Sequence, residues 1–179
     1  MKAQAKKQFV IAAIVLILLT SVTMAGNAAE NLIKYFEAGD GLDKYLTAYL
    51  DPVGIWTIGY GSIYNYDQNR KVLPGDKIDE ATALRYLKRE TAEIVPKIKA
   101  LVKVPINQNQ LDSLTSFVYN VGIGNFGSST LLKQLNQGLP KETVAEQFLR
   151  CNKGTINGKL TVLPGLTLRR EAEKKLFLK

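Results

Sequence analysis

The first pattern of apolar and polar positions after the N-terminal segment predicts a helix followed by a hairpin. Residues 30–37, ENLIKYFE, carry apolar side chains at the spacing of one helical face. Glycines end this helix, and the segments 45–50 and 55–61 alternate as short strands do, on either side of the turn-forming DPVG. A polar loop then covers residues 64–78, with a third strand predicted at residues 71–73.

A long amphipathic helix is predicted from Asp79 to about Val102. Asp79 suits the N-cap position, and Pro96 is expected to kink the helix or to separate its last turns. A one-sided helix of this length in mid-chain commonly bridges two lobes. Apolar residues recur along it at helical spacing, at Leu84, Leu87, Ile94, Ile98 and Leu101.

Only helices are predicted beyond this point. Asn107 and Gln110 stand in capping-box spacing at the start of an apolar stripe that ends at Gly122. The order of one helix, a hairpin and then helices indicates an α+β domain with its strands at one end. We expect a small N-terminal lobe with the hairpin, a long connecting helix and a helical C-terminal lobe. The further helical segments are residues 129–138, 140–151 and 167–178.

The first 29 residues form a segment of their own. Lysines precede an unbroken apolar run at residues 9–19, and the residues that follow are uncharged to the end of the segment. This pattern is typical of a signal peptide, cleaved after Ala28 or Ala29, but the uncharged stretch is also long enough to cross a bilayer. Both alternatives export the domain at residues 30–179 across the inner membrane, and an uncleaved segment would tether it through residues 9–29.

Composition fits one compact domain and limits the classes of partner that are expected. The 179 residues are 46% hydrophobic and 22% charged, which indicates a globular chain. The net charge is +8, and without the three lysines of the N-terminal segment it is near +5, which suits an anionic polymer without being diagnostic of one. No basic cluster alternates with aromatic residues, so no nucleic-acid partner is expected. The basic residues of RREAEKK are expected to form a solvated face.

The chain has no histidine and a single cysteine. This excludes Ser-His-Asp and Cys-His catalysis and histidine-based zinc sites. Cys151 has no partner for an internal disulfide, and its place in a predicted helix favours a buried, inert role. The acids are not clustered as ligands, so no metal and no cofactor is expected. Any catalysis must therefore rest on carboxylates.

Two carboxylates near the hairpin form the candidate catalytic pair. Glycoside hydrolysis needs a protonated carboxyl for the leaving oxygen and an ionised one that activates water or attacks the sugar. Glu37, at the end of an apolar helix, suits the first role, and Asp51, at a turn, suits the second. Thr57 is placed to hold a water with Asp51. Asp40 and Asp43 compete as acids, and acids at a helix end or before proline are also routine structural residues.

Three separated motifs resemble the phage-type, T4-like lysozyme and endolysin family. They are LIKYFE with the hairpin TAYLDPVGIWTIGYG, then LDSLTSFVYNVGIGNFGSSTLLKQLN, and finally LPGLTLRREAEKKLF. They occur in family order and span nearly all of residues 30–179. The N-terminal segment is similar to the signal-anchor-release segments of some endolysins, although those are richer in Gly and Ala.

The resemblance implies a lysozyme-like fold and a monomeric muramidase without metal or cofactor. Its substrate would be the β-1,4 bond between N-acetylmuramic acid and N-acetylglucosamine in bacterial peptidoglycan. By the same resemblance, Glu37 would be the proton donor, Asp51 would activate water or support the cation-like transition state, and Thr57 would position that water. The positions that line the cleft in the family correspond here to Ile63, Tyr119, Asn120 and Ser129.

Two departures from the family pattern limit what it implies. Relatives carry the Glu nine positions before the Asp, whereas Glu37 and Asp51 are 14 positions apart. We explain this by a five-residue extension within AGDGLDKY rather than by transfer of the acid's role to Asp43. Ser62 replaces a histidine of many relatives, which affects local stability more than chemistry. The altered spacing is the best argument for one alternative, a lysozyme-fold domain that binds glycan or protein without cleaving it. A further alternative is a hydrolase of another glycan, such as a chitosanase, which would use the same acids on a different sugar.

Overall fold

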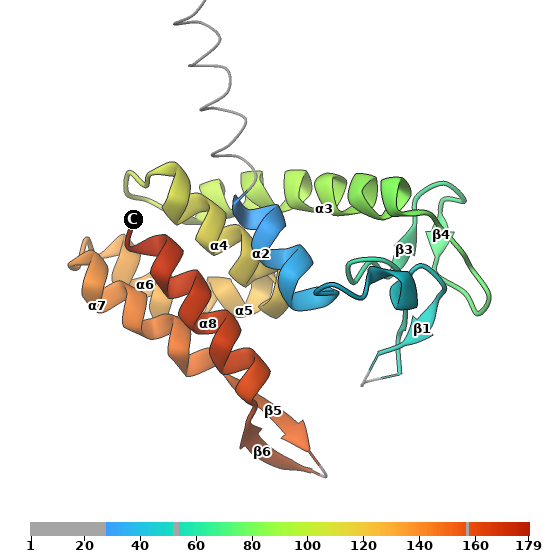
Figure 1. Cartoon of the computed structure of the whole chain (residues 1–179). Coiled ribbons are helices and arrows are strands. Elements are labelled where there is room, and N and C mark those ends of the chain that lie inside the picture. Colours follow the sequence, from blue (N-terminus) through green and yellow to red (C-terminus); the bar gives the residue numbers. More distant parts are fainter. Residues whose placement is uncertain (1–27, 52–53, 157) are drawn as a thin grey trace, which may run out of the picture.

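The computed structural model describes residues 28–51, 54–156 and 158–179 (Figure 1). These residues form a small lobe of short strands and a larger helical lobe, and helix α3 (Glu80–Leu101) runs along both. The predicted α+β organisation is confirmed. Almost all of the N-terminal segment lies outside the described residues, and within the described ranges no helix is long and apolar enough to cross a membrane.

Two antiparallel hairpins make up the strands of the small lobe. β1 (Tyr49–Leu50) pairs with β2 (Trp56–Thr57), and β3 (Tyr64–Asn65) pairs with β4 (Arg70–Lys71). The first strand is shorter than predicted, because the chain before it closes i→i+3 hydrogen bonds and forms the 3-10 helix η1 (Leu42–Tyr45). The predicted third strand is β4, which begins one residue earlier.

Helix α2 (Ala28–Glu37) carries the first candidate acid at its C-terminal end. It packs against α4 (Gln108–Val121) and α8 (Pro164–Phe177) of the large lobe, and also against α3. Its apolar side is anchored by Ile33, which is fully buried. Glu37 therefore lies where the small lobe begins, on a helix whose position is set by the large lobe.

Helix α3 begins as predicted and is continuous. The Asp79 carboxylate accepts a hydrogen bond from the Thr82 backbone N–H over 2.7 Å, which caps the helix. The helix continues through Pro96 to Leu101, so the alternative in which its last turns separate is not observed. The turn after the proline is retained because Ile98 is buried in the core of the large lobe.

The large lobe is built around α4. Its capping box forms as predicted: the Asn107 side chain accepts from the Gln110 N–H, and the Gln110 side chain accepts from the Asn107 N–H. Rings of the core meet edge to face, with Phe117 packed between Phe126 and Phe148. The other elements here are α5 (Ile123–Gly127), α6 (Thr130–Asn136), α7 (Lys141–Ala145) and the 3-10 helix η2 (Glu146–Cys151).

A third hairpin lies in the part of the chain where only helices are predicted. β5 (Lys153–Ile156) pairs antiparallel with β6 (Lys159–Val162) and projects from the start of α8 (Figure 1). The sequence does contain a signal for it, since Asn-Gly at residues 157–158 separates the two strands and is typical of a tight hairpin. The prediction that the strands are confined to one end of the domain is therefore wrong in this detail.

Candidate active site

Glu37 is held by the last helix of the fold. Nη1 of Arg169, in α8, donates to Glu37 Oε1 over 2.6 Å, and Arg169 is only 3% exposed. The same guanidinium donates to the Glu173 carboxylate and to the Ser116 carbonyl, and it lies 5.7 Å from the centre of the Phe36 ring. One oxygen of the candidate acid is thus fixed by a buried cation that is itself fixed on three sides.

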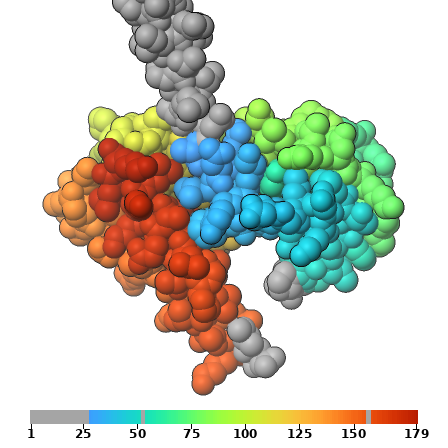
Figure 2. Space-filling view, in the orientation of Figure 1, coloured from blue at the N-terminus to red at the C-terminus, as the bar shows by residue number. Residues whose placement is uncertain are grey.

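The second oxygen of Glu37 faces a turn of the small lobe. A Cβ at Gly61 would lie 3.5 Å from Glu37 Oε2, and Gly61 has a φ of +100°. Glycine permits the left-handed backbone here, whereas a Cβ at 3.5 Å would be in ordinary contact with the carboxyl. Figure 2 shows the surface hollowed between the small lobe and the projecting hairpin β5–β6, with the end of α2 above the hollow.

Asp51 and Thr57 lie at the hairpin formed by β1 and β2. Asp51 Oδ1 accepts the Ile55 backbone N–H over 2.8 Å, so the carboxylate helps to close its own turn. Thr57 pairs with Tyr49 across the strands and is 4% exposed. Its hydroxyl donates to the Ile55 carbonyl over 3.0 Å, which leaves its oxygen available only as an acceptor.

Tyr49 connects the two candidate carboxylates electrostatically. The pKa of its phenol is raised to about 12, mainly by burial and further by the nearby charges of Glu37, Tyr45 and Asp51, which together give this value. The charges of Glu37 and Asp51 thus both act on the Tyr49 hydroxyl. Tyr49 was not among the predicted site residues, although it lies on β1 only two positions before Asp51.

The glycine-rich extension packs on the small lobe and does not enter the site. Leu42 and Leu46 pack against the small core, and the Tyr45 carbonyl accepts the Gly59 N–H over 2.7 Å. Both competing acids of the extension are exposed, and they line a separate polar hollow with Lys34, Tyr35 and Glu80. These competing acids are Asp40 and Asp43. Neither acid is among the groups that raise the pKa of Tyr49.

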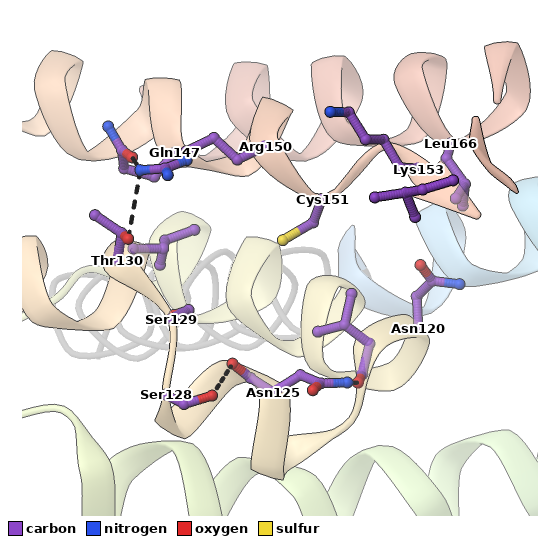
Figure 3. A pocket seen from close by; sticks show the side chains of 13 residues that line it. Asn120, Asn125, Ser128, Ser129, Thr130, Gln147, Arg150, Cys151, Lys153 and Leu166 are labelled. Atoms are coloured by element: carbon purple, nitrogen blue, oxygen red, sulfur yellow. Dashed lines mark hydrogen bonds between the residues drawn. The ribbon is translucent and has the colours of Figure 1, made fainter. Parts of the chain in front are cut away.

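Two of the predicted substrate contacts line a cavity of about 690 Å³ in the large lobe (Figure 3). Asn120 Oδ1 accepts from Arg170 Nη2 over 2.7 Å, and Ser129 caps α6 by accepting the Leu132 N–H. The thiol of Cys151 points into the same cavity. Cys151 is half-buried rather than buried, because a hairpin and not a packed helix follows it, and partial burial raises its pKa.

The other two predicted contacts lie elsewhere. Ile63 is 51% exposed at the edge of the small lobe. Tyr119 is half-buried, and its hydroxyl lies 2.9 Å from the Tyr60 carbonyl and 2.8 Å from Glu90 Oε2. Tyr119 is therefore tied to the turn beside Glu37.

The expectation that the basic residues of RREAEKK are solvated is wrong for both arginines. Arg169, Arg170 and Glu173 are each at most 3% exposed, and Glu173 forms ion pairs with both arginines. Burial raises the pKa of Glu173, while the two arginines lower it. The missed signal was the spacing, because Glu173 stands three and four positions after the arginines on one helix face.

The two-lobed fold, the long connecting helix and an acid at the mouth of a hairpin define a lysozyme-like glycoside hydrolase. The family model for phage lysozyme matches residues 40–173. The chain belongs to the phage lysozyme family, and it is a muramidase of the endolysin type that acts in peptidoglycan lysis. The resemblance and the lysozyme-like fold predicted from the sequence are thereby confirmed.

Individual relatives agree with this assignment. An endolysin of Acyrthosiphon pisum secondary endosymbiont phage 1 is 42% identical over 132 residues, which cover 74% of this chain and 86% of that protein. A SAR-endolysin of Enterobacteria phage PA-2 is 34% identical, with 84% and 86% covered. The chain spans about half of the longer endolysin of Bacillus phage B103, at 42% identity over 84% of this chain and 52% of that protein. The solved endolysin from Escherichia coli O157:H7 phage FAHEc1 superposes with a TM-score of 0.75 at 38% identity, covering 85% of this chain and 91% of that one.

Proposed function

We propose that Glu37 is the proton donor and Asp51 the water-activating carboxylate in hydrolysis of the β-1,4 bond between N-acetylmuramic acid and N-acetylglucosamine. The observation that carries this assignment is the asymmetric environment of the Glu37 carboxyl. Arg169 donates a hydrogen bond to Oε1, whereas Oε2 faces Gly61 in the turn between β2 and β3. Asp51 acts on the same Tyr49 hydroxyl as Glu37 does, which supports the pairing of the two acids.

In this mechanism the two oxygens of Glu37 have different tasks. Oε1 accepts the hydrogen bond from Arg169 throughout, and the transferable proton resides on Oε2. Oε2 gives that proton to the glycosidic oxygen as the bond to the anomeric carbon breaks. Asp51 takes a proton from the water that attacks this carbon, and the Thr57 oxygen accepts the water's other hydrogen. Each turnover therefore returns the pair to its starting charge after proton exchange with solvent.

Substrate contacts divide between the lobes. We expect Asn120 and Ser129 to contact the wall strand where it crosses the cavity of the large lobe, and exposed Ile63 to contact sugar from the small lobe. Tyr119 acts differently, through the turn that it holds. A metal or cofactor has no role in this proposal.

We further propose export across the inner membrane, with the enzyme acting on peptidoglycan as a monomer. The basic and apolar N-terminal segment at residues 1–29 supports export, and relatives such as the PA-2 protein are described as SAR-endolysins. The domain at residues 30–179 would be tethered through residues 9–29 wherever the segment is retained. Mass measurement of the exported protein distinguishes a retained segment from cleavage after Ala28 or Ala29.

The test of the catalytic assignment is Glu37→Gln in the full chain. The substitution keeps the hydrogen bond from Arg169 but removes the transferable proton, so clearance of purified cell walls should fall at least about a hundredfold. Asp40→Asn and Asp43→Asn are matched controls, since both acids are exposed, and both should clear walls at the wild-type rate.

Other outcomes of this test are equally informative. Loss of clearance in Asp43→Asn alone would transfer the acid's role to the extension. A wild-type protein that binds walls without clearing them would be a non-catalytic glycan-binding domain. Reducing-end analysis of the released fragments separates a muramidase from a glucosaminidase, and cleavage of chitosan in place of cell walls would identify a chitosanase.

A further inference from the structure

Glu90 is a half-buried carboxyl that the proposed chemistry does not use. It lies on α3 among three hydroxyl groups from two other parts of the chain, which we call the hydroxyl cluster: Ser62, Tyr66 and Tyr119. Glu90 Oε1 lies 2.6 Å from Ser62 Oγ and 3.2 Å from the Tyr66 hydroxyl, and Oε2 lies 2.8 Å from the Tyr119 hydroxyl. The cluster thus joins the small lobe, the connecting helix and α4 through one carboxyl.

The cluster holds the turn that faces Glu37 at its middle and at one end. Ile58 and Ser62 exchange backbone hydrogen bonds across this turn, at 2.8 and 3.0 Å. The Tyr60 carbonyl in its middle lies 2.9 Å from the Tyr119 hydroxyl. A Cβ at Gly61 would lie 3.5 Å from Glu37 Oε2 and 3.8 Å from Tyr119 Cε1. Any movement of this turn therefore moves the wall against which the second oxygen of Glu37 rests.

The contacts of the cluster outnumber its hydroxyl hydrogens. Tyr119 has one hydrogen but lies between two acceptors, the Tyr60 carbonyl and Glu90 Oε2. Ser62 likewise has one hydrogen, and it lies between the Tyr64 carbonyl and Glu90 Oε1. If Glu90 is ionised, each of these hydroxyls has a short oxygen–oxygen contact without a hydrogen in it. A carbonyl never donates, so within the cluster only Glu90 can supply a further hydrogen, and a proton on its carboxyl fills one of these two contacts.

A proton on Glu90 Oε2 completes one continuous chain. Glu90 then donates to the Tyr119 hydroxyl, and Tyr119 donates to the Tyr60 carbonyl. Oε1 remains an acceptor for Ser62 and Tyr66. We propose that Glu90, in its neutral form, is a positioning residue that holds the 58–62 turn against Glu37 and links the activity of the site to pH. The link to activity rests on the proposed role of Glu37, whereas the hydrogen-bond chain does not.

The charges around the cluster do not favour an ionised Glu90. Among the described residues no lysine or arginine forms an ion pair with Glu90, and Glu93 on the same helix adds a like charge. Arg89 stacks on the Tyr66 ring and pairs with Glu93. From α2, Glu37 faces Tyr119 as a further negative charge, opposed by Arg169 of α8. Burial is the largest cause that raises the pKa of Glu90, and bonds from Ser62, Tyr119 and Tyr66 lower it in part.

The direction of the resulting pH dependence follows from proton binding. Because the pKa of Glu90 is higher in the folded protein than its ordinary value of 4.5, the folded state binds more protons above that pH. The stability contributed by the cluster is therefore complete below about pH 4.5 and is lost as the pH rises through the pKa of the folded state. The wall beside Glu37 loosens over the same interval.

Glu90→Gln tests the proposal, because an amide reproduces the neutral carboxyl. Its NH₂ donates to Tyr119 and its oxygen accepts from Ser62 and Tyr66. The measurement is unfolding by urea from pH 4 to 9 on the full chain. The stability of the variant relative to the wild type should rise with pH, by about tenfold in the folded-to-unfolded ratio for each unit by which the pKa of Glu90 is raised. Glu80→Gln, an exposed change of the same charge on the same helix at a residue that is not among the groups acting on Glu90, should follow the wild-type profile in this respect.

Activity provides the second measurement. The ratio of wall clearance by Glu90→Gln to that by the wild type should rise on the alkaline side, since the variant keeps the turn in place. Tyr119→Phe, which cuts the chain at its middle, should lower clearance at every pH. An unfolding profile of Glu90→Gln parallel to that of the wild type overturns the hydrogen-bond chain, whatever the activity. A changed unfolding profile with an unchanged activity ratio overturns the positioning role, and active Glu37→Gln overturns the proposed function alone.

Discussion

Arg169 has the most demanding environment of the residues that contact the candidate acid. It is buried, and its three sets of hydrogen bonds reach Glu37, Glu173 and the Ser116 carbonyl in different directions. Only a planar guanidinium offers donors in this fork geometry, whereas an ammonium is a compact charge on a flexible stem. The environment of residue 169 therefore requires the shape of a guanidinium and not merely a positive charge.

Arg169→Lys should therefore be harmful despite its retained charge. We expect a loss of about 1–3 kcal/mol in the free energy of unfolding for the hydrogen bonds to charged groups that lysine cannot reproduce, together with slower wall clearance. Arg85→Lys is the matched control, because Arg85 also forms a forked ion pair, with Asp67, but both side chains are about half exposed. Urea unfolding of both variants gives the comparison, and equal losses would show that the fork at Arg169 adds nothing.

The turn between β2 and β3 depends on glycine for two separable reasons. Gly59 has a φ of +62°, and a Cβ there would lie 3.1 Å from Ala83 Cβ and 3.3 Å from Ile78 Cδ1. Gly75, in the loop before α3, has a φ of +84° but nothing within 4 Å of a Cβ. The first glycine thus serves backbone conformation and close packing, and the second serves conformation alone.

A comparison of Gly59→Ala with Gly75→Ala should separate these two costs. Each substitution should lower the free energy of unfolding by about 1–2 kcal/mol, because alanine disfavours the left-handed region. Gly59→Ala should lower it further, because the added methyl group would meet Ala83, a buried residue of α3 in the small core. Gly59→Ala should also slow wall clearance, since it displaces the turn that faces Glu37. Thermal or urea unfolding of the pair measures the difference. Identical losses would mean that the small lobe absorbs the added methyl without strain.

The sequence was most informative where local chemistry decides structure. The N-cap at Asp79 and the capping box at Asn107 and Gln110 were predictable because each involves residues three positions apart. The buried charges of α8 were not, because Arg169 finds Glu37 only after the whole domain has folded. Glu90 lay within reach of sequence reasoning, since it stands three positions after Leu87 and four before Ile94, on the apolar side of its helix.

The assignment of site residues follows the same division. The motifs indicated Glu37, Asp51 and Thr57, and in the structure the charges of Glu37 and Asp51 both raise the pKa of Tyr49. Their roles remain predictions for the experiments above. Tyr49 and Arg169 were missed because neither resembles a catalytic residue when it is considered without its neighbours.

The molecule as a whole has two cores of unequal size. Among the described residues, the large core holds thirteen buried residues and the small one four, so the small lobe has less apolar burial to keep it closed. The strands of the small lobe are also only two residues long. We therefore expect the small lobe to open locally while the large lobe remains folded.

Hydrogen exchange with Leu114→Ala tests this expectation. Leu114 is fully buried in the large core, and its truncation should lower the protection of α4 amides by about 2–5 kcal/mol. Amides of β3 and β4 should keep their wild-type protection, because they exchange through an opening that leaves Leu114 buried. If those amides lose as much as α4 does, the two lobes unfold as one unit.

The contact between Glu37 and Arg169 has a consequence for the synthesis of the protein. The two residues are 132 positions apart, so the acid emerges from the ribosome long before its partner is made. A nascent chain that has not reached α8 has both carboxylates but lacks the cation that fixes the first of them. An unfinished chain therefore cannot hold Glu37 as the complete domain does, and the proposed acid is fixed only once α8 has been made.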